Sequence, residues 1–132
     1  RTLFEQRAPN IGALMHPVSK STKKAYRWGN GGIGWPLVET KGLLVVEETL
    51  APGCSEKHHY HNQAAQCFKM LVGCAVMQFA DGQNVEIDTG MALHIPPETC
   101  HAIVNQTGEE IRFLVISAPS SRGDRHEVEQ DK

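Results

Sequence analysis

Three histidines lie within the four-residue stretch HHYH at positions 58–61. Because side chains alternate between the two faces of a β-strand, His59 and His61 point to one face while His58 and Tyr60 point to the other. Neutral imidazole is the most common protein ligand for transition metals, so two imidazoles on one face can bind a metal ion together. The spacing favours part of a metal site. The alternative is a pair of half-exposed strand histidines that bind nothing.

Short, regularly spaced strands are expected to position these histidines. Segments rich in Val, Ile, Leu, Phe and Thr alternate with turns rich in Gly, Pro, Asp and Asn, a pattern typical of an all-β sandwich or barrel. No long stretch has a helical period, so few helices are expected. The expected strands cover residues 43–50, 57–62, 66–72, 74–79, 84–87, 91–95, 100–105 and 110–117.

The two ends of the chain are less regular than its middle. Segment 27–36 has four glycines and a proline around Trp28 and Trp35, which favours a packed loop or irregular arm over a strand. The two tryptophans are expected to cover one mouth or flank of the barrel, or a subunit interface. The end of the chain is polar, which favours an edge segment or partial disorder. The predicted plan is an arm (1–42) packed on a barrel (43–117), followed by a tail (118–132).

Composition and charge restrict the classes of partner. A chain of 132 residues with 40% hydrophobic residues suits one domain. Thirteen basic residues against fifteen acidic ones, without a basic stripe, argue against a nucleic-acid partner. The apolar runs are too short to cross a bilayer, which predicts a cytoplasmic protein without a membrane partner. Because the sequence begins at Arg1 and not at methionine, a removed leader is an open alternative.

Four cysteines occur in the sequence, and none has the CxxC spacing of a zinc or redox motif. They are expected to be reduced thiols, since the domain is large enough to fold without disulfides. Strand parity turns Cys67 and Cys100 away from the face that carries the histidines. The four are Cys54, Cys67, Cys74 and Cys100.

The histidine pair lies within a longer pattern, GCSEKHHYHNQAAQCFKMLVG. Gly53 precedes His59 by six residues, Gln66 follows His61 by five, and Gly73 follows Gln66 by seven. This pattern resembles the first motif of the cupin superfamily, with Gln66 where the family usually has glutamate. The downstream stretch GMALHIPPETCHAIVN resembles the second cupin motif, with Glu98 in place of the usual glycine. Its matching residues are Gly90, Pro96, His101 and Asn105.

The resemblance implies an all-β cupin fold, a double-stranded β-helix or jelly-roll barrel, with an irregular N-terminal arm. It implies that His59, His61 and His101 bind one divalent metal ion inside the barrel, with Gln66 as the candidate fourth ligand. Iron is the first candidate metal, and zinc, nickel and manganese are the alternatives. The resemblance also implies a homodimer, and the hint in the sequence is an apolar alternation, expected to be exposed, at Leu44, Val46 and Leu50.

The glutamine changes the charge expected at the metal. Three imidazoles and a neutral amide leave a divalent site near plus two, whereas a carboxylate would leave it near plus one. We therefore expect the site to favour an anionic or readily deprotonated oxygen ligand. Gln66 either binds the metal directly or hydrogen-bonds to a bound water or substrate, because an amide oxygen is a weaker donor than a carboxylate.

The same departure removes a base that some cupin enzymes use. The candidates for catalytic roles are then Gln66, Tyr60, His94 and Glu98, together with Glu47, and the alternative for His94 is a hydrogen-bonded barrel residue. Apolar residues share the expected inner face, which predicts a small and greasy cavity without converging arginines or a row of carboxylates. These residues are Phe68, Met70, Ile111, Phe113 and Val115.

Three function classes follow from this reading. The first is a mononuclear-metal enzyme of the dioxygenase type, acting on a small enolisable or anionic oxygenated substrate. The second is a non-redox isomerase, lyase or cyclase that uses zinc, nickel or manganese. The third is a non-catalytic barrel that binds a small molecule.

Overall fold

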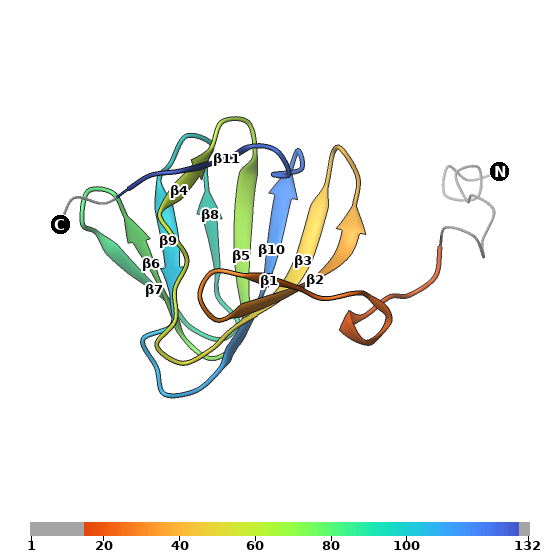
Figure 1. The fold of residues 1–132 in the computed structure, drawn as a ribbon, viewed down its shortest axis with the longest axis horizontal. Helices are drawn as coiled ribbons and strands as arrows, with labels where there is room; N and C mark the ends of the chain where they lie inside the picture. Colours follow the sequence, from red (N-terminus) through yellow and green to blue (C-terminus); the bar gives the residue numbers. More distant parts are fainter. Residues whose placement is uncertain (1–14, 130–132) are drawn as a thin grey trace.

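The computed structural model describes residues 15–129, which fold into two antiparallel sheets that face each other (Figure 1). The six-stranded sheet has the order β1-β2-β3-β10-β5-β8 and the five-stranded sheet the order β11-β4-β9-β6-β7. A single 3-10 turn, η1 (Lys20–Thr22), precedes the strands within the described residues. This arrangement confirms the predicted all-β jelly-roll fold. The strands are β1 (Tyr26–Trp28), β2 (Gly32–Glu39), β3 (Leu44–Leu50), β4 (His59–His61), β5 (Ala65–Val72), β6 (Ala75–Phe79), β7 (Asn84–Ile87), β8 (Ala92–Ile95), β9 (His101–Val104), β10 (Ile111–Ala118) and β11 (Arg125–Glu127).

The core lies between the two sheets and follows the two-residue period of the strands. Along β5 and β10 every second side chain is buried, as the sequence predicts. Burying a large apolar side chain contributes about 2–3 kcal/mol, so this layer provides much of the stability of the barrel. The buried cluster comprises Leu50, Phe68, Met70, Ala75, Met77, Ile87, Ile95, Ile103, Ile111, Phe113 and Val115. Across residues 15–129, no helix has the length and apolar character needed to span a membrane.

The glycine-rich segment after Tyr26 forms strands, so the prediction of a loop or irregular arm was wrong there. β1 pairs with β2, and β2 pairs with β3 in the six-stranded sheet. The glycines leave room for aromatic rings on the neighbouring strand: a Cβ at Gly34 would lie 2.6 Å from the Tyr26 ring, and one at Gly32 would overlap the Trp28 ring. Glycine in a strand interior often marks this kind of close approach and does not always mark a turn.

The alternating apolar residues of β3 were expected to be exposed, but they are buried. Leu44, Val46 and Leu50 are buried, because β3 is a central strand between β2 and β10 and these positions face the interior. They do not form an exposed surface for a second copy. The homodimer therefore stays a prediction, and the sequence feature that supported it is part of the core.

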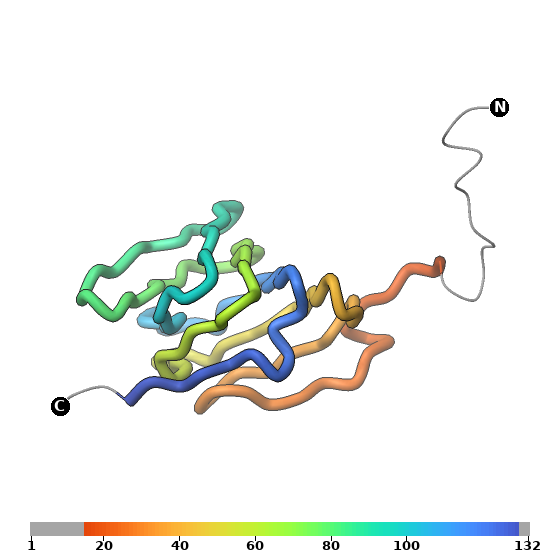
Figure 2. Tube along the Cα trace, turned by 90° about the horizontal axis from the view of Figure 1, so that it is seen from above, coloured from red at the N-terminus to blue at the C-terminus, as the bar shows by residue number. Residues whose placement is uncertain are grey.

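The polar end of the chain crosses from one sheet to the other. After β10 in the six-stranded sheet, the chain passes over the top of the barrel, and β11 pairs with β4 at the edge of the five-stranded sheet (Figures 1 and 2). We call residues 119–128 the strap. Residues Arg125–Glu127 therefore form an edge strand. Residues 130–132 of the predicted tail lie outside the described residues.

Candidate metal centre

Three imidazoles converge between the sheets. β4 carries His59 and His61, and β9 begins with His101, which lies opposite His59 in the antiparallel register. All three side chains are buried, and their ligand atoms lie within 4.8 Å of one another. The topology therefore unites the two histidines of the first motif with the histidine of the second.

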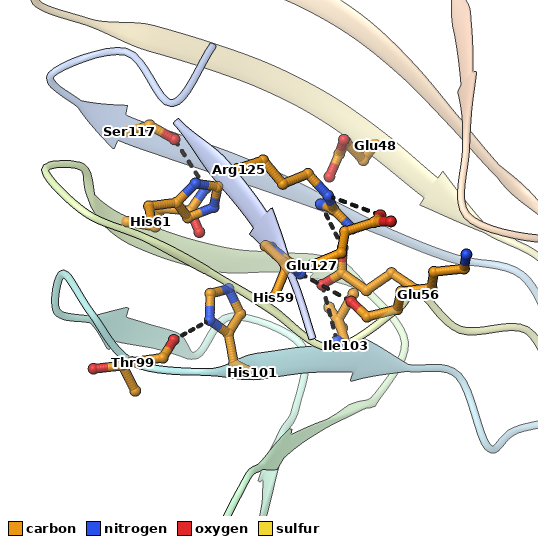
Figure 3. Close-up of polar contacts among 12 residues, drawn as sticks. Glu48, Glu56, His59, His61, Thr99, His101, Ile103, Ser117, Arg125 and Glu127 are labelled. Atoms are coloured by element: carbon orange, nitrogen blue, oxygen red, sulfur yellow. Dashed lines mark hydrogen bonds and ion pairs between the residues drawn. The ribbon is translucent and has the colours of Figure 1, made fainter. Parts of the chain in front are cut away.

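Backbone carbonyls hold each imidazole in one orientation. The Nδ1 atom of His59 lies 2.9 Å from the Lys57 carbonyl oxygen, and that of His101 lies 2.7 Å from the Thr99 oxygen (Figure 3). The Nδ1 atom of His61 lies 3.0 Å from the Asp124 carbonyl oxygen. A carbonyl only accepts hydrogen bonds, so Nδ1 carries the proton in each ring and the Nε2 lone pair is free.

The free nitrogens fit a metal ion. Nε2 of His61 and Nε2 of His101 are buried without a hydrogen-bond partner among the described residues. Buried polar atoms are almost always paired, so two unpaired lone pairs in one cluster need a ligand to satisfy them. Burial lowers the pKa of His59 to about 2 and that of His101 to about 4, and it also lowers the pKa of His61. All three rings are therefore neutral near pH 7, as metal ligation requires.

Gln66 faces the triad from the opposite sheet. It lies on β5, and its Nε2 donates a hydrogen bond of 3.0 Å to Oγ of Ser117, its register partner on β10. The amide oxygen Oε1 is buried and has no partner among the described residues. Because Ser117 fixes the amide, the oxygen is available to a metal ion or to a metal-bound molecule. Three nitrogens and one oxygen, all neutral, suit a divalent transition metal.

A cavity of about 440 Å³ opens beside the triad and differs from the small greasy space predicted from the sequence. Apolar side chains, among them Phe68, Val46 and Val115, line part of it. Besides the predicted site residues, charged and polar groups that the sequence did not predict there line the rest. They include Tyr26, Glu48, Glu56, Arg122, Arg125 and Glu127. The expectation of a wall without converging arginines or carboxylates was therefore wrong.

Glu48 places a carboxyl group in this cavity. It lies on the same face of β3 as Val46, and Oη of Tyr26 donates a hydrogen bond of 3.3 Å to its Oε2. Burial, together with a smaller effect of the nearby Glu56 carboxyl group, raises the pKa of Glu48 to about 8. Burial also raises the pKa of Tyr26. At pH 7 the Glu48 carboxyl group is therefore mostly protonated and can release a proton, while its smaller ionised fraction can accept one.

Glu56 lies between the triad and the strap. Its Oε1 accepts the Ile103 N–H at 3.1 Å, and its Oε2 lies 3.6 Å from Nη1 of Arg125 (Figure 3). The same Oε2 lies 3.9 Å from Nδ1 of His59. Burial raises the pKa of Glu56 to about 7, although Arg125 acts in the opposite direction. Glu56 thus contacts His59 on β4, Ile103 on β9 and Arg125 on the strap.

Four side chains proposed for proton handling lie outside the cavity. Tyr60 points to the other face of β4, where it stacks on His126 with ring centroids 5.1 Å apart. His94 is exposed on β8 opposite Cys67, and Glu98 is exposed in the loop before β9. Glu47 lies 3.8 Å from Nε of Arg112. Of the catalytic candidates chosen from the sequence, only Gln66 lines the cavity.

Other positions in the two motifs have structural roles. Gly53, Gly73 and Gly90 have φ angles of 70°, 95° and 87°, which glycine adopts without strain. Glu98 has a φ of 60°, which explains why the motif usually has glycine there. Asn105 is buried and donates hydrogen bonds to the Leu50 and Glu109 carbonyls at 3.0 and 2.7 Å.

The remaining histidine and cysteine predictions have mixed outcomes. His58 points away from the triad as predicted, but it is buried and its Nε2 lies 3.3 Å from Gln78 Oε1, so it is not a surface residue. The four cysteines are free thiols, as predicted.

Of the cavity residues that the sequence did not predict, some could have been found from strand parity and others could not. Glu48 shares its strand face with Val46, so the two-residue period could have placed it once β3 was known to face inward. Arg122 and Arg125 line the cavity only because the strap crosses between the sheets, and no local pattern indicates that path.

Comparison with known proteins supports the resemblance. The family model for the cupin domain matches residues 46–117, more than half of the chain. The chain therefore belongs to the cupin family. No curated protein matched the sequence.

Solved structures share the fold. The polyketide cyclase RemF from Streptomyces resistomycificus is 23% identical, with 90% of this chain and 89% of that chain covered and a TM-score of 0.77. A Klebsiella pneumoniae protein with a double-stranded β-helix domain is 19% identical, with coverages of 88% and 99% and a TM-score of 0.74. A predicted oxalate decarboxylase from Thermotoga maritima is 22% identical, with coverages of 80% and 100% and a TM-score of 0.71. At these identities the likeness concerns the fold alone.

Proposed function

We propose that this cupin is a mononuclear-metal enzyme that moves a proton on a small, anionic or enolisable, oxygenated organic substrate. The observation that carries the proposal is the buried triad, whose Nδ1 atoms are held by carbonyls while Nε2 of His61 and His101 have no partner. A divalent metal bound there would act as a Lewis acid that polarises a substrate oxygen. Because the ligand set is neutral, a bound divalent metal would keep its charge near plus two, which would favour an anionic oxygen.

The cavity beside the triad supports proton transfer. Glu48 is the candidate general acid and base, because it lines the same cavity as His59 and His61 and its pKa of about 8 lies close to neutral pH. Tyr26 donates a hydrogen bond to the Glu48 carboxylate and so stabilises its charged form after the proton has left. Phe68 and Val115 on the apolar part of the wall reduce the access of water.

These residues favour an isomerase, lyase or cyclase over the dioxygenase that the sequence analysis placed first. Isomerases, lyases and cyclases move protons and need no change in the oxidation state of a metal. Proton transfer needs an acid or base beside the substrate, and Glu48 supplies one. The names of RemF as a polyketide cyclase and of the Thermotoga protein as a predicted oxalate decarboxylase are compatible with this class of substrate. A fold does not determine a reaction, so the metal centre is argued from the triad and the choice among reactions from the residues of the cavity.

An iron-dependent dioxygenase is the second candidate. The observation in its favour is the neutral set of three imidazoles and an amide oxygen, which leaves coordination positions for a substrate. Oxygen consumption with enolisable substrates would select this candidate. Turnover of the same substrates under argon would select proton transfer.

A deuterium-exchange assay tests the proposal. The protein is loaded with Zn²⁺, Ni²⁺, Mn²⁺ or Fe²⁺ under argon, and wash-in of solvent deuterium at the α-carbon of small diketones and keto acids is followed by NMR. We expect exchange that falls about a hundredfold in Glu48→Gln and stays near the wild-type rate in Glu47→Gln, whose carboxylate lies outside the cavity. Equal rates in Glu48→Gln and wild type would contradict the role of Glu48.

A further inference from the structure

The orientation of His61 depends on a distant part of the chain. His59 and His101 lie beside carbonyls only two residues before them, on the same segment. The Nδ1 atom of His61 instead lies beside the carbonyl of Asp124, 63 residues further along the chain. Of the three imidazoles, His61 is therefore the one whose position requires the strap.

The Asp124 side chain fastens the strap at this point. Its Oδ1 accepts the Asn62 N–H at 2.9 Å, and its Oδ2 accepts the N–H groups of Gln63 and Ala64 at 2.9 and 3.1 Å. These three amides directly follow His61. One carboxylate therefore ties the loop after β4 to the strap and sets where the Asp124 carbonyl lies.

The strap also forms one side of the cavity. β11 pairs with β4 so that Arg125 lies opposite His61 and Glu127 opposite His59, and the Val128 N–H donates to the His58 carbonyl at 2.8 Å. Figure 3 shows β11 crossing beside the triad with the Arg125 side chain turned toward Glu56. Lining residues from the strap are Ser121, Arg122, Gly123, Arg125 and Glu127.

The strap is well suited to open. β11 has only three residues, a neighbour on one side and exposed side chains, whereas β4 and β9 carry buried ones. Segments with few buried contacts and short ladders open at a lower free-energy cost than core strands. Opening would remove the hydrogen-bond acceptor of His61 and one wall of the cavity together.

We propose that the strap is a clasp whose closure is coupled to metal binding, with Asp124 as the residue that positions His61. The proposal rests on the metal centre of the proposed function and does not depend on the reaction. Coupling between two equilibria is reciprocal, so the factor by which the closed strap tightens metal binding equals the factor by which the metal favours closure. Metal occupancy therefore controls access to the cavity, and a molecule that displaces the strap weakens metal binding.

Metal affinity of strap variants is the first test. The dissociation constant for Co²⁺ is measured by competition with a chromophoric chelator, and the visible spectrum of bound Co²⁺ reports the ligand geometry. Loss of a group that orients a metal-bound histidine typically costs 10–100-fold in affinity, so we expect Asp124→Ala to weaken binding about tenfold and to alter the spectrum. Asp124→Asn, which keeps one acceptor oxygen, should lose less. Equal affinity and spectra in wild type and a folded Asp124→Ala would overturn the clasp.

Asp81→Ala is the matched control. Its carboxylate also accepts a backbone N–H, that of Gln83 at 2.9 Å, but in the turn between β6 and β7. We expect its Co²⁺ affinity to lie within twofold of the wild-type value. Far-UV circular dichroism and thermal unfolding of each metal-free variant establish that it is folded. A tenfold loss in Asp81→Ala would show that the effect is not specific to the strap, and would also overturn the proposal.

Hydrogen exchange with and without Co²⁺ measures the reciprocal effect. We expect the metal to slow exchange at the Gln63, Ala64 and Val128 amides by about the factor that Asp124→Ala loses in affinity, and to leave Gln83 unchanged. Unchanged exchange at the strap in a wild type that binds Co²⁺ would overturn the clasp alone. A wild type that binds no Co²⁺ would overturn the metal centre, and the clasp with it.

Discussion

Two groups of three side chains within residues 15–129 bring candidate metal-ligand atoms within 4.8 Å of one another. One is the triad His59, His61 and His101, and the other is Cys74, Glu86 and Asp88. The triad is buried, and carbonyls fix its rings so that their free nitrogens converge. In the second group the two carboxylates are exposed to water.

The second group is also the poorer ligand set. A hydrogen bond with Asp88 raises the pKa of the Cys74 thiol, which keeps the thiol protonated, whereas metals bind the thiolate. The burial of the triad instead lowers the pKa of its rings and keeps them neutral. Proximity is thus common to both clusters, and burial with oriented lone pairs is what separates a candidate metal centre from a surface cluster.

Zn²⁺ should stabilise the protein through the triad and not through the second cluster. At a metal concentration about a thousand times Kd, we expect a gain of about 4 kcal/mol in the free energy of unfolding of the wild type. His101→Ala should lose nearly all of this gain, and Asp88→Ala should keep it, as measured by thermal unfolding with and without Zn²⁺. The reverse pattern would place the metal at the surface cluster.

A buried and an exposed carboxylate should differ in their effect on stability against pH. Because the pKa of Glu48 rises from 4.5 to about 8 on folding, its contribution is fully present below pH 4.5 and is lost as the pH rises through 8. Between those limits one such group lowers the free energy of unfolding of the metal-free protein by at most about 1.4 kcal/mol per pH unit. We expect Glu48→Gln to remove that slope in urea unfolding from pH 5 to 8.5.

Glu86→Gln is the matched control for this slope, because the Glu86 carboxylate is exposed in the second cluster. Its curve should run parallel to that of the wild type. A Glu48→Gln protein whose stability still falls at the wild-type slope would mean that Glu48 is not the buried acid described above.

Gln66→Glu should sharpen the contrast by adding charge to the buried site. A carboxylate is a stronger ligand than an amide oxygen, so we expect metal binding about tenfold tighter, or about 1.4 kcal/mol. Ser117 can donate a hydrogen bond to the new carboxylate in place of the one that it accepts from Gln66. Oxalate, as a small dianion, should bind the metal-loaded variant more weakly in calorimetry, and unchanged oxalate affinity would count against the charge argument.

The smallest effect is expected in the backbone that supports the triad. The Glu98 N–H donates to the His61 carbonyl at 2.6 Å, and Glu98 has a φ of 60°. Glycine tolerates this conformation, so we expect Glu98→Gly to gain about 0.5 kcal/mol in urea unfolding. Glu98→Ala keeps the Cβ and should show no gain. A loss of stability in Glu98→Gly would mean that contacts of the Glu98 side chain stabilise the fold by more than its positive φ costs.

The sequence predicts the triad better than the cavity around it. Strand parity pairs His59 with His61, and the family motif adds His101 and Gln66, because these features repeat with a short period or a known spacing. Glu48 and Arg125 reach the cavity through the packing of β3 and the path of the strap. Long-range contacts of that kind leave no local signal, so the acid and base candidates chosen from the sequence lie largely outside the cavity.

The strands of the fold can likewise be divided into those with a local sequence signal and those without one. Alternating apolar residues placed strands such as β5 and β10, because burial imposes a two-residue period on their sequence. β2 was missed, because glycines that make room for Tyr26 and Trp28 resemble turn glycines when the neighbouring strand is unknown.

Elemental analysis of the protein, purified without chelator and without a histidine tag, tests the central claim most directly. Wild type, His59→Ala and Cys74→Ala are compared before and after reconstitution with Fe²⁺, Zn²⁺, Ni²⁺ or Mn²⁺. We predict about one metal ion per chain in the wild type and in Cys74→Ala, and almost none in His59→Ala. A wild type that stays free of metal after reconstitution, or a His59→Ala protein that keeps the full amount, would contradict a metal centre at the triad.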